Sequence, residues 1–163
     1  MKTVYFVRHA KSSWSNESLR DIERPLNKRG LKDAPMMARK LREKRVKPDL
    51  FLSSPAKRAL TTAEIFAASL DVDAIRVEAQ LYEAFPEDVL RVIQGVEDAV
   101  QILFVFGHNP TFFVLANRFS QSELDNVPTC GIVRVDANID SWRDFRENTG
   151  RMAEFLYPKL FYS

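Results

Sequence analysis

The sequence contains one cysteine, Cys130, and two histidines, His9 and His108. A single cysteine cannot form a disulfide within the chain, so nothing in the sequence points to an oxidising compartment. Two histidines are too few for a multi-histidine metal site, and with one cysteine the donor set argues against structural zinc. We therefore expect no metal and no cofactor.

Long apolar runs and a large excess of one charge are also missing. The 24 Lys and Arg residues against 22 Asp and Glu leave a formal net charge of +2, too small to drive nucleic-acid binding through bulk electrostatics. No apolar run reaches the length of a membrane span, and the apolar residues 4–7 are too few for a signal-peptide core. We expect a cytoplasmic protein with no nucleic-acid or membrane partner.

Glycine is scarce, with five in 163 residues, and the sequence has no Gly-rich Walker loop of the kind that cradles nucleotide phosphates. Nothing therefore indicates a nucleotide-driven kinase or ATPase. The remaining composition, 45% hydrophobic and 28% charged, is ordinary for a soluble globular protein. The length predicts one domain over residues 1–163, large enough to bury a sizeable core.

Strand-like and helix-like segments alternate along the chain. The expected strands cover residues 3–7, 50–52, 75–77, 101–106 and 132–135, and a hairpin or edge region with a closing strand follows at 142–158. Helical patterns fill most of the intervals between these strands. This alternation predicts an α/β fold, a single three-layer α/β/α domain with a mostly parallel central sheet and helices on both faces.

Two of the expected helices have recognisable first residues. Asn27 is the predicted N-cap of a helix that Pro35 should kink. The predicted buried stripe of this helix is Leu31, Ala34, Met37, Ala38 and Leu41. Ser54 is the predicted N-cap, and Pro55 the first residue, of a helix that runs to about residue 70.

The first turn of this second helix contains Lys57 and Arg58. The helix dipole already makes that environment positive, so cations there cost stability unless an anion is bound. We expect Arg58 to be buried against such an anion and Lys57 to be exposed.

Residues able to do chemistry follow two apolar strands. Arg8 and His9 come at the end of the first strand, and His108 follows the strand at 101–106. Ligands of open α/β sheets bind beyond the carboxyl ends of the strands, so we expect these side chains to meet at one edge. Guanidinium groups bind oxyanions, and an imidazole can accept a phosphoryl group covalently. Together with Arg58, these residues predict a phosphoryl pocket; the alternative is that they are ordinary polar strand ends.

Five segments carry a family pattern: Val-Arg-His-Ala at 7–10, Arg-Pro-Leu-Asn at 24–27 with Gly30, the Ser-Ser-Pro segment at 53–63, Leu-Tyr-Glu-Ala at 81–84, and Gly-His-Asn-Pro at 107–110. Their order resembles that of the histidine phosphatase superfamily, also called phosphoglycerate-mutase-like. The resemblance implies that His9 becomes phosphohistidine. It also implies that Arg8, Arg58 and His108 hold the phosphoryl group, and that Glu83 donates a proton.

The pattern departs from the family at Ala10, where glycine is usual, and at Lys11, where an acid often follows. This form, with the short chain, resembles the small SixA-type phosphohistidine phosphatases, whose pocket lacks a lid. An imidazole leaving group needs less protonation than an alkoxide, so the role of Glu83 is open in this branch. Ser15, in the loop after the first strand, is a further phosphate-binding candidate. Trp14 in the same loop is either an exposed contact for a partner or a buried anchor.

The residues and the resemblance together predict a metal-independent phosphatase that works through phosphohistidine, with phosphohistidine in a protein as its substrate. One alternative is a phosphatase or mutase acting on a small phosphoester, and another is a non-catalytic module that recognises phosphate. For in-line attack, one nitrogen of His9 must stay free. We expect the other to donate to a backbone carbonyl near Gly30 or just after Ala10.

Overall fold

The computed structural model describes residues 1–162, and its centre is one six-stranded sheet in the order β3-β2-β4-β1-β5-β6. The strands are β1 (Lys2–Arg8), β2 (Leu50–Ser53), β3 (Ile75–Val77), β4 (Ile102–Gly107), β5 (Ile132–Ala137) and β6 (Gly150–Leu156). Neighbours from β3 through β1 run parallel, whereas β5 is antiparallel to both β1 and β6. The prediction of a mostly parallel sheet is confirmed.

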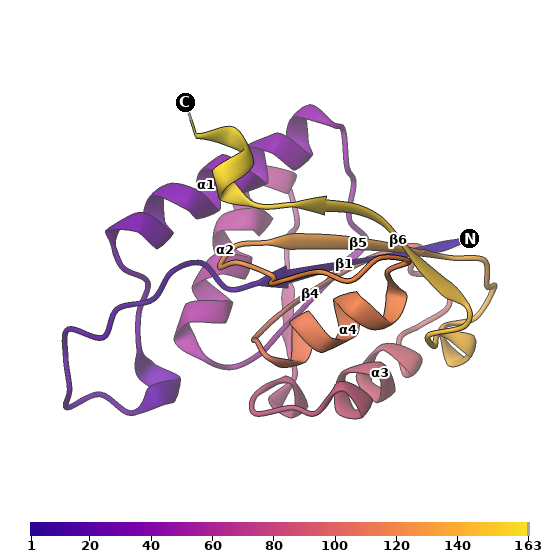
Figure 1. Ribbon diagram of the computed structural model, residues 1–163, viewed down its shortest axis with the longest axis horizontal. Helices are drawn as coiled ribbons and strands as arrows, with labels where there is room; N and C mark the ends of the chain where they lie inside the picture. Colours follow the sequence, from indigo (N-terminus) through magenta and orange to yellow (C-terminus); the bar gives the residue numbers. More distant parts are fainter. Residues whose placement is uncertain (163) are drawn as a thin grey trace.

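Four helices cover the two faces of this sheet (Figure 1). They are α1 (Lys28–Glu43), α2 (Lys57–Leu70), α3 (Pro86–Gln94) and α4 (Thr111–Phe119). Side chains alternate across a strand, so Val4 and Phe6 of β1 pack with α3 and α4, while Tyr5 and Val7 pack with α1 and α2. The predicted three-layer α/β/α arrangement is confirmed. Among residues 1–162, no helix has both the length and the apolar character needed to cross a membrane.

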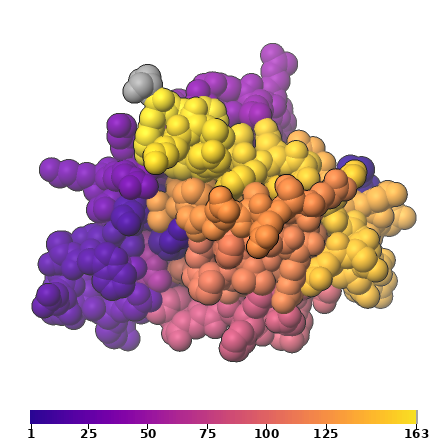
Figure 2. All heavy atoms as spheres, viewed as in Figure 1, coloured from indigo at the N-terminus to yellow at the C-terminus, as the bar shows by residue number. Residues whose placement is uncertain are grey.

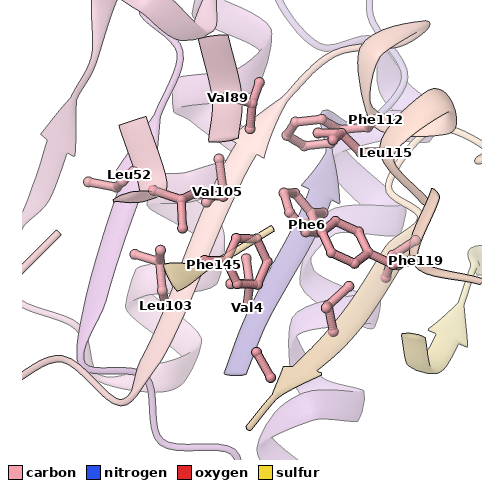
Figure 3. Packing of buried hydrophobic residues seen from close by; sticks show 14 of the residues in the cluster. Val4, Phe6, Leu52, Val89, Leu103, Val105, Phe112, Leu115, Phe119 and Phe145 are labelled. Atoms are coloured by element: carbon pink, nitrogen blue, oxygen red, sulfur yellow. The ribbon is translucent and has the colours of Figure 1, made fainter. Parts of the chain in front are cut away.

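Aliphatic side chains and a group of phenylalanine rings form the core between the sheet and the α3–α4 layer (Figure 3). The ring of Phe6 lies 5.4 Å from that of Phe112 and 6.3 Å from that of Phe119, measured between centroids. Each such side chain contributes on the order of 1.5–3 kcal/mol by leaving water. This packing fixes β1 and β4 side by side, and their carboxyl ends become rigid supports for the residues that follow.

Helix α1 begins as predicted, because the Asn27 side chain accepts a hydrogen bond from the Gly30 amide at 2.9 Å. The predicted stripe is wrong at Leu31, which is 53% exposed, whereas Asp33 is fully buried. A Cβ at position 30 would lie 2.2 Å from the Lys11 carbonyl oxygen. The helix therefore presents Gly30 to the chain after β1, and Leu31 turns outward.

Helix α2 begins two residues later than predicted. Its first residue is Lys57 and its N-cap is Ala56, which has no capping side chain. The Ser54 hydroxyl accepts from the Ala56 amide at 3.2 Å, so it stabilises the turn before the helix instead of capping the helix itself. Arg58 is 7% exposed and Lys57 is exposed, as predicted.

Candidate active site

The two histidines meet at the carboxyl edge of the sheet. Arg8 and Gly107 are register partners on the parallel strands β1 and β4, so His9 and His108 follow at matching positions. Their ring centroids are 5.3 Å apart, and the His9 amide donates to the Gly107 carbonyl at 3.0 Å. The expectation that the histidines share one edge is confirmed.

Backbone contacts fix the tautomer of His9. Its Nδ1 lies 2.7 Å from the Ala10 carbonyl oxygen. A carbonyl can only accept, so Nδ1 carries the proton and Nε2 keeps its lone pair. A carbonyl partner was predicted, but its source was not: it belongs to Ala10 itself, neither to the backbone near Gly30 nor to the residues after Ala10. Burial lowers the pKa of His9 to about 3, and the positive charges of Arg8 and Arg58 act in the same direction.

Ser54 orients His108. The serine Oγ lies 2.8 Å from His108 Nε2 and already accepts from the Ala56 amide. The hydroxyl is therefore free to donate to Nε2, which leaves the proton of the neutral imidazole on Nδ1. Burial, with the charge of Arg58 next in size, lowers the pKa of His108 to about 4. Its Nδ1 is buried and has no hydrogen-bond partner among residues 1–162, so it can donate to a ligand.

Arg8 and Arg58 are held in the same way. Nη1 of Arg8 donates to the Val127 carbonyl at 2.9 Å. Nη1 and Nη2 of Arg58 donate to the backbone oxygen and the Oδ2 of Asp21, at 2.8 and 3.1 Å. In both side chains the buried Nε lacks a partner within the described part of the chain. A buried donor without a partner costs about 1–3 kcal/mol, and an oxyanion in the pocket would remove that cost.

Asp21, which the sequence analysis did not single out, also joins the network around His108. The Tyr82 hydroxyl donates to Asp21 Oδ2 at 2.6 Å, and the Tyr82 ring lies 5.8 Å from the His108 ring. The hydrogen bond from Tyr82 and the contact with Arg58 lower the pKa of Asp21, while that of Tyr82 rises to about 12. Asp21 is therefore an anion that positions Arg58.

Two predicted site residues make none of the contacts that join the histidines and arginines of the site. Glu83 is exposed and has a left-handed backbone with φ of 54°. Ser15 is exposed too, and its hydroxyl lies 2.8 Å from that of Ser13. The roles assigned to Glu83 and Ser15 remain predictions, as do the individual roles of His9, Arg8, Arg58 and His108. The residues described by the structure contain no group of three or more His, Cys, Asp or Glu side chains placed to hold a metal ion.

The model of the histidine phosphatase superfamily (branch 1) matches residues 4–101. The chain belongs to this superfamily. It is 38% identical over 166 residues to an uncharacterised protein of Mycobacterium tuberculosis, covering 94% of this chain and 100% of that protein. A crystal structure from Agrobacterium tumefaciens, described as the phosphohistidine phosphatase SixA, is 29% identical with a TM-score of 0.82, over 96% of this chain and 98% of the other.

A second structure has the same fold: a protein histidine phosphatase SixA complexed with tungstate, 21% identical with a TM-score of 0.83, over 98% of this chain and 99% of the other. The family match and these similarities show that the chain is a phosphatase of the SixA-type branch and acts on a phosphorylated substrate.

The buried histidines predict that this phosphatase loses stability as the pH falls from 6.5 to 5. Folding lowers the pKa of His9 to about 3 and of His108 to about 4, against about 6.5 in the unfolded chain. Below pH 6.5 the unfolded state therefore binds protons that the native state does not bind. Each imidazole lowers the free energy of unfolding by about 2 kcal/mol by pH 5. The loss should be measurable by urea unfolding at a series of pH values.

The matched control for this pH series is His9→Asn, which removes one of the two titrating groups. Its loss of stability between pH 6.5 and 5 should be about half that of the wild type. The carboxylates with lowered pKa values, such as Glu97, contribute mainly at lower pH, below about 4.5. An equal pH slope in wild type and variant would contradict the assignment of a neutral, buried His9.

Proposed function

We propose that this phosphatase hydrolyses phosphohistidine on a protein through a phosphorylated His9. The observation that carries the proposal is the state of His9: it is buried and neutral, and its Nδ1 proton is tied to the Ala10 carbonyl, so that Nε2 is a free nucleophile. The similarity to SixA-type structures supports the substrate class.

In the first step, His9 Nε2 forms a bond to phosphorus while the P–N bond of the substrate breaks. The departing imidazole takes the electron pair and a proton from solvent. Charge in such a transition state spreads over the three equatorial phosphoryl oxygens. Nε of Arg8, Nε of Arg58 and the Nδ1 proton of His108, which have no partner among residues 1–162, are available to stabilise it.

In the second step, a water molecule attacks the phosphorus of phospho-His9 and the P–Nε2 bond breaks. The electron pair returns to Nε2, the proton of the water goes to solvent, and inorganic phosphate leaves. Splitting the reaction in this way replaces one difficult displacement by two easier ones. The hydrogen bond from Nδ1 to Ala10 keeps the ring oriented for both.

The position of Glu83 favours an N-phosphoryl substrate. Release of an alkoxide from a phosphoester calls for a strong proton donor, whereas an imidazole is a far better leaving group. Glu83 is exposed, and Asp21, the carboxylate bonded to Arg58, has a lowered pKa and so stays ionised. Asp21 therefore has no proton to give, and Glu83, which lies outside the contacts of the histidines and arginines, is left as a weak donor; this arrangement suits phosphohistidine better than a sugar phosphate.

We expect Glu83→Gln to impair phosphoester hydrolysis at least fivefold more than phosphohistidine hydrolysis, because only the alkoxide depends on acid catalysis. The measurement is kcat/KM of wild type and variant on a phosphohistidine protein, on phosphosugars and on nucleotides. Glu87→Gln, an exposed acid nearby that pairs with Arg118, is the control and should behave like wild type. Faster turnover of a phosphosugar than of phosphohistidine by the wild type would contradict the proposed substrate.

A further inference from the structure

The peptide group that joins His9 to Ala10 lies just beyond Arg8, the last residue of β1. The chain leaves the sheet here and forms a long loop, which extends beyond the strands in Figure 1 and makes the indigo lobe at the left of Figure 2. Ala10 nevertheless supplies the carbonyl that orients the His9 ring. A fixed ring therefore requires that this stretch of backbone be held by contacts outside the strand ladder.

Two hydrogen bonds hold this peptide group, one at each end. The His9 carbonyl accepts from the Cys130 amide at 3.0 Å, and the Ala10 amide donates to the Thr62 hydroxyl at 3.0 Å. Thr62 is fully buried in α2 and lies 52 residues from Ala10 along the chain. Because a buried amide without a partner is costly, the peptide group cannot turn freely while Thr62 is in place.

The Thr62 hydroxyl makes a second bond, which connects it to the phosphoryl-binding turn of α2. It donates to the Arg58 carbonyl at 2.7 Å, as threonine often does to the carbonyl four residues earlier in a helix. A hydroxyl has one proton and two lone pairs, so the same oxygen can also accept from the Ala10 amide. Thr62 therefore ties the helical turn that contains Arg58 to the backbone that follows His9.

We propose that Thr62 is a positioning residue of this phosphatase: through the Ala10 backbone it keeps the His9 ring oriented for attack and in register with Arg58. Its side chain acts only through these hydrogen bonds and takes no part in bond making. The inference rests on the proposed function in taking His9 as the nucleophile. The orientation of the ring, however, can be measured without turnover.

The test compares Thr62→Val with Thr62→Ser, and the control is Thr61→Val, a half-buried position on the same helical turn. Valine has nearly the shape of threonine but can neither donate nor accept, whereas serine keeps the hydroxyl. Thr62→Val should lower kcat at least about tenfold and change KM less than about threefold, because a misplaced nucleophile impairs attack more than binding. Thr62→Ser and Thr61→Val should both stay within about threefold of wild type in kcat.

A measurement on His9 itself separates positioning from a general loss of structure. Near pH 7 the ¹⁵N chemical shifts of the wild-type ring should show one tautomer, with the proton on Nδ1, and slow exchange of that proton with water. In Thr62→Val this exchange should be at least about tenfold faster, because the carbonyl that accepts the proton is no longer fixed. Thr62→Ser should restore the slow exchange.

An unchanged exchange rate of the His9 Nδ1 proton in Thr62→Val would overturn the proposal, and so would equal losses of kcat in Thr62→Val and Thr62→Ser. If Thr62→Val does not fold, Thr62→Cys replaces it, because a thiol fills the site but is a weak acceptor. Failure of the proposed function is distinct: if His9→Asn is still phosphorylated during turnover, His9 is not the nucleophile. In that case the exchange rate alone decides whether Thr62 positions the ring.

Discussion

His9→Asn is expected to lower kcat on phosphohistidine and on phosphoesters by at least about 10⁴-fold, because it removes the nucleophile of the proposed two-step reaction. Asparagine keeps a polar side chain of similar reach but has no lone pair able to accept the phosphoryl group. Rapid quenching with an alkaline denaturant during turnover of a ³²P-labelled phosphoester should trap label on wild-type protein. The variant should carry no label.

Folding of the variant is checked with tungstate, which we expect the arginines and His108 to bind without the His9 ring. The acid lability of phosphohistidine gives a second check, since the trapped label should be lost in acid and retained in base. An undiminished yield of label in His9→Asn would place the covalent intermediate elsewhere. Burst kinetics in wild type would show that hydrolysis of phospho-His9 limits turnover.

The position of His9 could be predicted from the sequence because it depends on local rules. An apolar run followed by Arg8 and His9 reads as a buried strand with functional groups at its carboxyl end. The same rule places His108 after β4. Two parallel strands packed in one core must bring such residues to the same edge, and the measured ring separation of 5.3 Å follows from that register.

The supporting residues could not be predicted in the same way. Ser54 was identified as a helix cap from its position before Pro55, but its hydroxyl serves the Ala56 amide and His108. Asp21 lies in a polar loop without periodicity, and its contacts with Arg58 and Tyr82 depend on how that loop folds back through the pairing of Ser12 with Leu26. Such long-range contacts have no signature in local sequence.

The error at Leu31 has a different origin. Hydrophobic periodicity favours leucine over aspartate on a buried face, yet Asp33 is buried and accepts a hydrogen bond from the Tyr162 hydroxyl at 2.6 Å. The close approach of Gly30 to Lys11 sets which side of α1 turns inward, and a partner 129 residues away satisfies the buried carboxylate. The stripe was correct from Ala34 to Leu41, where apolar packing alone determines burial.

Arg58 and Lys57 offer a comparison between adjacent cations on one helix turn. Arg58 is buried, and its Nε has no hydrogen-bond partner among residues 1–162, while Lys57 is exposed. If the positive first turn of α2 exists to bind an anion, only the buried residue should matter for catalysis.

Arg58→Ala is therefore expected to lower kcat/KM at least about a hundredfold, the usual loss when a preorganised contact to the transition state is removed. Lys57→Ala should stay within about twofold of wild type at physiological salt, because an exposed charge is screened. Asp21→Asn is a third variant in this comparison: it keeps a hydrogen bond to Arg58 but removes the anion that positions it. Its kcat should fall less than that of Arg58→Ala. Comparable mild effects of Arg58→Ala and Lys57→Ala would show that α2 does not supply the phosphoryl-binding cation.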